Sequence, residues 1–348
     1  MRREALILTL LSLMTLAFGP PALREKDAAG LKLYPCQVRE MAENRPPSIE
    51  ARAFLLADYA TGTILLARNE RERFPPASLT KIMTAILALE NSSPGDSVAV
   101  SEKAAEVEMP KLGLLPGQKV PMETLLYGLI LISANDAAAA IAEHVAGSQE
   151  AFVEMMNRKA AELGMNDTHF TNPQGFDDEG HYSTAYDLWL LVRYALANPA
   201  FAALAATYEW GGFTSTNRFL ALYPGADGVK TGTTPLAGEC LIASATRRDQ
   251  KGIAILLNSP DRYGDAASLL DYYFRNYALV PLSSPNLDVV KDPSGKVETL
   301  AVEGESYILV EKWKAPLLRF YRRLSPDELL IYLGDEVIAS RPLKRVER

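Results

Sequence analysis

Cysteine and histidine are scarce in this chain, and their scarcity excludes several kinds of protein. The two cysteines, Cys36 and Cys240, are too few for a disulfide framework, although a bond between them stays open. The three histidines have no spacing that suits a metal ion, and we predict no metal and no cofactor. Basic runs are also lacking and the net charge is −7, so no nucleic-acid partner is expected.

The amino terminus lacks the length of apolar sequence that a membrane span needs. Arg2 and Arg3 precede an apolar run from Ala5 to Phe18, shorter than the ~20 residues of a transmembrane helix. This order predicts a signal peptide over residues 1–19, with an uncleaved membrane anchor as the alternative because Pro20 would follow the cut. We therefore expect export to the cell envelope, outside the cytoplasm.

A serine and a lysine stand three residues apart in Ser78-Leu79-Thr80-Lys81, hence on one face of a helix. A lysine held neutral by burial or by a neighbouring charge can accept the hydroxyl proton, which makes Ser78 a candidate nucleophile and Lys81 a candidate base. Such a pair alone is expected about once by chance in a chain of this length. Two later segments, Ser133-Ala134-Asn135 and Lys230-Thr231-Gly232, complete a far more specific ordered trio.

With these motifs the chain resembles the low-molecular-mass penicillin-binding proteins that act as serine-type D-alanyl-D-alanine carboxypeptidases. The resemblance extends from about Ala53 to about Tyr277. Further matching segments are residues 56–62, 75–84, 172–175, 181–187 and 228–234, with Ala237 and Gly238. It implies removal of the terminal D-alanine from peptidoglycan pentapeptide stems through an acyl-enzyme, and covalent inhibition by β-lactam antibiotics. The stem peptide and the β-lactams are thus the expected binding partners.

The resemblance also implies catalytic roles for particular residues. Ser78 would attack, Lys81 would act as the base, and Ser133 would pass a proton to the leaving amine. We expect nearby Lys230 and partial burial to lower the pKa of Lys81, which would keep its amine neutral.

The same resemblance implies how the substrate is bound. Asn135 would hydrogen-bond Lys81 and the substrate amide, and Lys230 with Thr231 would hold the free carboxylate of the terminal D-alanine. The backbone N–H of Thr233, with that of the nucleophile, would form the oxyanion hole. Gly232 would keep the strand open for the peptide. An arginine could assist the carboxylate site, and the sequence does not choose between Arg247, Arg248 and Arg262.

Strand patterns at both ends of the central region flank helical patterns, which predicts an α+β fold with helices packed on an antiparallel sheet. This agrees with the transpeptidase/β-lactamase-like fold that the resemblance implies. The expected helices are residues 78–90, 123–132, 136–145, 150–163, 185–197 and 266–277. The expected strands are residues 54–57, 63–66, 228–233, 240–246 and 252–257.

The chain is predicted to have several parts. We expect a lead-in over residues 20–50, a serine DD-peptidase catalytic domain over 51–280 and a small β-rich carboxy-terminal domain over 286–348. Outside the motifs, Asp177-Asp178-Glu179 is expected to be a solvated loop and His181 to be structural.

Three alternatives to a carboxypeptidase remain. A β-lactamase is disfavoured because no Glu-x-x-Leu-Asn-type segment lies between Asn135 and Lys230. A DD-endopeptidase or transpeptidase would differ only in the peptidoglycan strand that serves as the leaving group or as the acceptor of the acyl group. A catalytically silent cell-wall-binding protein is disfavoured because all the candidate catalytic residues are intact.

Overall fold

The computed structural model describes residues 45–282, 290–291, 297–303, 307–324 and 326–346. The predicted signal segment, most of the lead-in, Cys36 and residues 283–285 after Leu282 lie outside them. The chain divides into two compact units. The larger unit comprises Ser48–Tyr59 and Ala67–Asp271, and the carboxy-terminal unit includes Ala60–Leu66 and the described part of Tyr272–Arg348.

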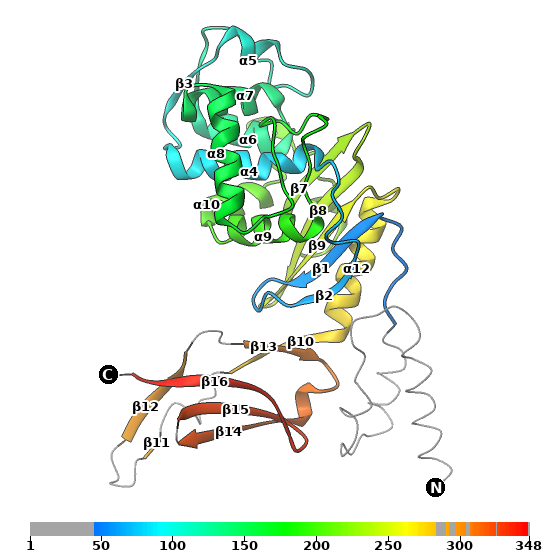
Figure 1. Ribbon diagram of the computed structural model, residues 1–348, viewed down its shortest axis with the longest axis vertical. Coiled ribbons are helices and arrows are strands. Elements are labelled where there is room, and N and C mark those ends of the chain that lie inside the picture. Colours follow the sequence, from blue (N-terminus) through cyan, green and yellow to red (C-terminus); the bar gives the residue numbers. More distant parts are fainter. Residues whose placement is uncertain (1–44, 283–289, 292–296, 304–306, 325, 347–348) are drawn as a thin grey trace. The chain divides into compact units, whose positions relative to one another are not determined.

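The main sheet has the order β2-β1-β9-β8-β7, shown in Figure 1. Its strands are β1 (Ala53–Asp58), β2 (Ile64–Arg68), β7 (Ala226–Thr234), β8 (Gly238–Arg247) and β9 (Gln250–Leu257). The neighbours β1, β9, β8 and β7 pair antiparallel. Apolar residues on both faces make β8 and β9 largely buried, as expected for central strands covered on two sides.

A cluster of helices packs with this sheet. They are α4 (Lys81–Asn91), α6 (Met122–Leu131), α7 (Asn135–Ala146), α8 (Gln149–Glu162), α9 (Ala185–Leu196) and α10 (Pro199–Ala206), and α12 (Arg262–Asn276) follows β9. The α4 helix contacts α6, α7, α8, α9 and α10 and is buried from Lys81 to Ala88. Its apolar residues on most sides explain this central position. The predicted α+β fold is confirmed.

Several elements have patterns too short to predict from the sequence. They are the helices α5 (Glu102–Glu106) and α11 (Phe219–Leu222), the ribbon β3 (Ser97–Ala99) with β4 (Lys119–Pro121), and the ribbon β5 (Glu209–Trp210) with β6 (Phe213–Thr214). Among the described residues, no single helix has the length and apolar composition to cross a membrane. The α9 and α10 helices would meet those requirements only as a pair, and they are bent by 106° at their break.

The carboxy-terminal unit is rich in strands. Two-stranded pairing joins β10 (Tyr277–Pro281) to β13 (Tyr307–Glu311). A second sheet has the order β11-β12-β16-β15-β14. Its strands are β11 (Val290–Lys291), β12 (Val297–Val302), β14 (Leu318–Leu324), β15 (Asp327–Leu333) and β16 (Glu336–Val346).

Candidate active site

Ser78 lies in a short 3-10 helix, Ala77–Thr80, directly before α4. Ala77 has a φ of +49°, in the left-handed region that residues with a side chain rarely adopt. Two glycines allow other segments to approach this turn. A Cβ on Gly175 would lie 2.0 Å from the Ala77 carbonyl oxygen, and one on Gly232 would lie 3.1 Å from the Ser78 nitrogen. Backbone therefore encloses the turn so closely that Gly175 has no room for a side chain and Gly232 has little.

The Lys81 amine is fully buried and has three oxygen neighbours. Nζ lies 3.0 Å from Ser78 Oγ, 2.8 Å from Asn135 Oδ1 and 2.6 Å from the Gln174 carbonyl oxygen. The last two oxygens can only accept hydrogen bonds. They can thus accept one hydrogen bond from each N–H group of a neutral amine, which leaves the nitrogen lone pair to accept a hydrogen bond from the Ser78 hydroxyl.

Electrostatics favour that neutral amine. Burial lowers the pKa of Lys81 well below its usual value, and the positive charge of Lys230 lowers it further. The expected direction is therefore found, but burial is complete rather than partial and is the larger cause.

Asn135 begins α7 and fixes the Lys81 amine against a neighbouring loop. Its Oδ1 accepts from Lys81, while its Nδ2 donates to the carbonyl oxygens of Glu108 and Met109, each at 3.0 Å. Both amide hydrogens therefore already have acceptors within the protein.

Ser133 lies between α6 and α7 with a φ of +61°. Its Oγ is buried and has no hydrogen-bond partner among the described residues. A buried hydroxyl without a partner costs about 1–3 kcal/mol, so its retention here requires an explanation beyond stability.

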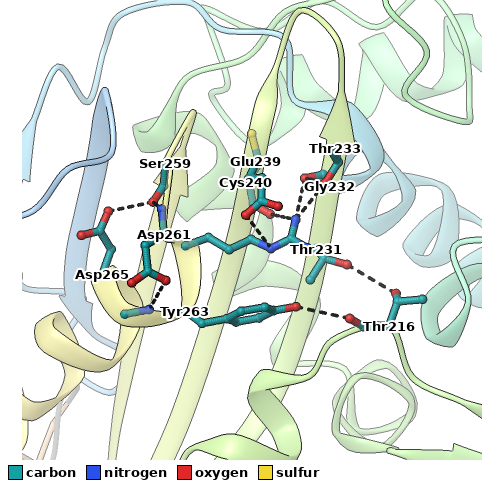
Figure 2. A network of polar contacts seen from close by, with 12 residues as sticks. Thr216, Thr231, Gly232, Thr233, Glu239, Cys240, Ser259, Asp261, Tyr263 and Asp265 are labelled. Atoms are coloured by element: carbon teal, nitrogen blue, oxygen red, sulfur yellow. Dashed lines mark hydrogen bonds and ion pairs between the residues drawn. The ribbon is translucent and has the colours of Figure 1, made fainter.

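Lys230 is buried in β7, the strand that passes beside the Ser78 turn. Its Nζ donates to the Thr231 carbonyl oxygen at 3.0 Å. Burial, together with the positive charge of Arg262, lowers the pKa of Lys230 to about 7. The Thr231 hydroxyl lies 3.5 Å from that of Thr216, as Figure 2 shows. Hydrogen bonds thus join Ser78, Lys81 and Asn135, but none in the described part of the chain joins Lys230 to them.

Of the three candidate arginines, the structure places Arg262 at this strand. Its Nη1 donates to Thr233 Oγ1 at 2.9 Å and to the Gly232 carbonyl oxygen at 3.2 Å. Its Nε lies 3.6 Å from Glu239 Oε2, and the side chain is only 14% exposed. Figure 2 shows Thr233, Gly232 and Glu239 around this position.

The other two arginines lie elsewhere. Arg247 donates to the Pro224 carbonyl oxygen and pairs with Asp271 at 3.5 Å. Arg248 is exposed at the turn between β8 and β9. The sequence could not single out Arg262 among the three candidates, because the contact that α12 gives it with β7 joins residues 30 positions apart.

The loop Asp177-Asp178-Glu179 was expected to be solvated, and Asp178 and Glu179 are exposed, but Asp177 is only partly exposed and has fixed partners. Its Oδ1 accepts from Thr234 Oγ1 at 2.6 Å and its Oδ2 from the Leu236 backbone N–H at 3.0 Å. The carboxylate therefore ties its loop to the end of β7, one residue after Thr233. No signal in the sequence marks this long-range contact.

His181 is structural, as expected. Its Nε2 lies 2.8 Å from Thr80 Oγ1, and its Nδ1 accepts from the Thr171 backbone N–H at 3.0 Å. Burial lowers the pKa of His181 to about 4, so the ring is neutral at physiological pH. Cys240, the only cysteine within the described residues, is buried in β8, as expected of a small core residue.

Comparison with known proteins places this site in a family context. A family model described as D-alanyl-D-alanine carboxypeptidase matches residues 40–261. D-alanyl-D-alanine carboxypeptidase DacF of Bacillus subtilis is 36% identical over 301 residues, which cover 81% of this chain and 74% of the relative. The DacD carboxypeptidase of Escherichia coli is 36% identical in an alignment of 362 positions that covers 92% of this chain and 93% of the relative.

Solved structures agree with the sequence comparison. Penicillin binding protein 6B from Escherichia coli superposes with a TM-score of 0.74 at 32% identity, covering 86% of this chain and 96% of that one. Penicillin binding protein 5 from Haemophilus influenzae superposes with a TM-score of 0.75 at 27% identity, covering 87% and 98%. The likeness therefore extends beyond the segment that the family model matches.

Proposed function

The chain belongs to the D-alanyl-D-alanine carboxypeptidase family of serine peptidases, and from this premise we propose that Ser78 is its nucleophile. The protein is a serine-type D-Ala-D-Ala carboxypeptidase that acts on peptidoglycan pentapeptide stems. One observation carries the assignment of Ser78: its Oγ lies 3.0 Å from the Lys81 amine, whose other hydrogen-bond partners among the described residues, Asn135 Oδ1 and the Gln174 carbonyl oxygen, can only accept.

Acylation would begin with proton transfer from Ser78 to neutral Lys81. The Ser78 Oγ–carbon bond forms at the carbonyl of the penultimate D-alanine, and the C–N bond to the terminal D-alanine then breaks. The leaving amine takes up the proton that Lys81 has gained. Water subsequently attacks the ester carbon and the bond from that carbon to Ser78 Oγ breaks. The water oxygen becomes part of the new terminal carboxyl group of the shortened stem, and Ser78 regains its hydrogen.

Ser133 is the candidate relay for the proton that reaches the leaving amine. Its buried Oγ has no partner in the described residues. The leaving amine of the substrate and the protonated Lys81 could therefore both hydrogen-bond to it without displacing an existing contact. This accounts for a hydroxyl whose burial otherwise only destabilises the fold.

The oxyanion would be stabilised by the backbone N–H groups of Ser78 and Thr233. The close packing of Gly232 against the Ser78 turn supports this proposal, because it brings the start of that turn beside β7. Donors fixed in this way need no rearrangement when negative charge develops on the substrate oxygen.

The terminal carboxylate would be bound by cationic and hydroxyl groups on and beside β7. Lys230 and Arg262 supply positive charge, and the hydroxyls of Thr231 and Thr233 supply donors. A bound carboxylate would also raise the pKa of Lys230 and so keep it protonated. Asn135 would reach the substrate amide only if its Nδ2 exchanged the Met109 carbonyl oxygen for that of the peptide.

We assign residues 51–280 to catalysis and residues 286–348 to an accessory β-rich domain. Because the substrate lies outside the cytoplasm, we place the enzyme at the cell envelope, exported by the segment at 1–19. Whether it stays on the outer face of the membrane depends on cleavage of that segment. Mass spectrometry of the protein from the envelope fraction would decide this, since an uncleaved chain would retain its first residues.

The experiment that tests the nucleophile is covalent labelling with penicillin. Intact-mass measurement should show one adduct on the parent enzyme and none on Ser78→Ala. Peptide mapping should locate the adduct on Ser78. If Ser78→Ala takes the label, or if the parent forms no adduct, the assignment is wrong.

A second measurement separates the carboxypeptidase from a DD-endopeptidase. Release of D-alanine from pentapeptide should exceed cleavage of cross-linked dimers. Slow release of the penicillin adduct would further argue against a β-lactamase, since no candidate deacylating glutamate motif occurs between the second and third motifs.

A further inference from the structure

The sheet of the carboxy-terminal unit has one apolar face, and this face covers a small core. Leu329, Ile331 and Leu333 alternate along β15 and are buried. Phe320 and Leu343, from the strands on either side of β15, pack against the core formed by Leu329, Ile331 and Leu282. The alternation assigns the intervening residues to the opposite face of the sheet.

That opposite face carries aromatic and basic side chains at matching register positions. Tyr332 stands opposite Arg319 on one side and Val337 on the other. The next row on this face places Tyr321 opposite Leu330. The rings of Tyr321 and Tyr332 meet edge to face with centroids 5.2 Å apart, and Tyr321 is 52% exposed. Arg323, Ser340 and Lys344 continue the same face. We call these residues the outer face.

The segment that supplies most of this sheet is more basic than the chain as a whole, and three of its cations, Arg319, Arg323 and Lys344, lie on the outer face. Residues 307–346 contain eight Lys and Arg against five Asp and Glu, a net charge of +3 within a chain whose total is −7. Arg323 pairs with Glu328 on this face. Arg319 and Lys344 have no hydrogen-bond or ion-pair partner in the described part of the chain, and both are exposed. No acidic side chain of the described residues therefore competes with an anionic partner for these two cations.

We propose that the outer face is a second, non-catalytic binding surface for peptidoglycan, the polymer on which the enzyme acts. This inference rests on the proposed substrate. The stem peptides carry carboxylates, which suit guanidinium and ammonium groups. The glycan supplies sugar rings, and exposed tyrosines offer both an apolar ring face and a hydroxyl. A polymer held here stays close to the enzyme, which raises its effective concentration at Ser78 without changing the chemistry.

The proposal is tested by sedimentation of the full chain with insoluble peptidoglycan sacculi, using Ser78→Ala as the parent so that no acyl-enzyme forms. Replacement of both Arg319 and Lys344 by Ser should weaken binding about three- to tenfold, the range expected for two exposed ion pairs. Tyr321→Ser should weaken it separately. Binding should also fall as salt rises, because exposed charges are screened.

A matched control removes two exposed cations from the larger unit. Lys119→Ser with Arg248→Ser makes the same change in net charge at exposed positions and should bind sacculi as the parent does. Circular dichroism of all variants checks that the exposed substitutions leave the fold intact.

A second readout distinguishes failure of this proposal from failure of the proposed function. With Ser78 restored, the Arg319→Ser/Lys344→Ser enzyme should cleave a short soluble D-Ala-D-Ala peptide like the wild type and release less D-alanine from sacculi. If the wild type fails on the short peptide, the proposed function is wrong, yet the sedimentation result still stands.

Three outcomes would overturn the surface proposal. The double variant could bind sacculi as tightly as its parent. The same substitutions could abolish capture by phosphatidylglycerol vesicles while sacculus binding is unchanged, which would assign the face to a membrane. Sedimentation velocity could show that the substitutions dissociate a dimer, which would assign the outer face to contact with a second copy of the chain.

Discussion

Asp177 and Thr234 are joined by a 2.6 Å hydrogen bond across 57 residues of sequence. The same carboxylate also accepts from the Leu236 backbone N–H. Asp177 follows the segment whose Gln174 carbonyl oxygen accepts from the Lys81 amine. One short loop therefore positions both the proposed base and the end of the strand that carries Thr233.

The first prediction concerns this link. Asp177→Asn removes the charge from both hydrogen bonds and should lower kcat about tenfold, since hydrogen bonds to charged groups contribute about 1.5–3 kcal/mol. KM should change little, because the link would position the Thr233 backbone N–H, which acts on the oxyanion of the transition state rather than on the bound ground state. Steady-state kinetics with a D-Ala-D-Ala peptide would measure the split.

Its control is Glu179→Gln, which removes a charge from an exposed position of the same loop. This variant should retain wild-type kinetics. Equal losses in both variants would show that loop charge, not the link to Thr234, matters.

The second prediction concerns the packing around the nucleophile. In Gly175→Ala the new Cβ would lie 2.0 Å from the Ala77 carbonyl oxygen, so the Ser78 turn must shift. We expect a loss of about 3 kcal/mol or more in the free energy of unfolding, together with much slower penicillin acylation. Urea unfolding and stopped-flow labelling would measure these effects.

Gly164→Ala is the matched control for that change. Gly164 has a φ of +76° but nothing within 4 Å of a new Cβ, so only backbone strain is added. This substitution should lower the free energy of unfolding by about 1 kcal/mol and leave the rate of acylation unchanged. Comparable acylation defects in the two variants would contradict the packing argument.

The sequence predicted the helices and strands that have long hydrophobic patterns. It did not predict the roles of residues whose partners are distant in the sequence. The apolar helix that contains Lys81 and the strand that contains Lys230 were both predictable, because periodicity and the motifs are local. Arg262 and Asp177 were not singled out, since their roles arise from where α12 and a loop meet β7. The burial of Lys81 was underestimated for the same reason, because Asn135 and the Gln174 carbonyl oxygen, 54 and 93 residues away, lie against its amine.

The third prediction separates the arginines that the sequence left equivalent. Arg262→Gln should lower kcat/KM for a peptide with a free terminal carboxylate by about 10–100-fold, because a charged donor near the carboxylate is lost. A peptide whose carboxyl terminus is amidated should be turned over poorly by both enzymes, with little difference between them. Arg248→Gln should behave like the wild type. A similar defect in Arg248→Gln would refute the assignment of Arg262.

The last prediction is the pH dependence. Lys81 must be neutral to accept a proton and its pKa is lowered well below 10.5, so kcat/KM should already be high at neutral pH and fall in acid. Lys230 must be protonated to hold the carboxylate, and its pKa is about 7, so kcat/KM should decline as the pH rises above that value. The alkaline limb of kcat should lie at higher pH, because the bound carboxylate raises the pKa of Lys230. Lys230→Arg keeps its charge in this range and should remove the alkaline limb at some loss of activity. An alkaline limb that persists unchanged in Lys230→Arg would assign it to another group.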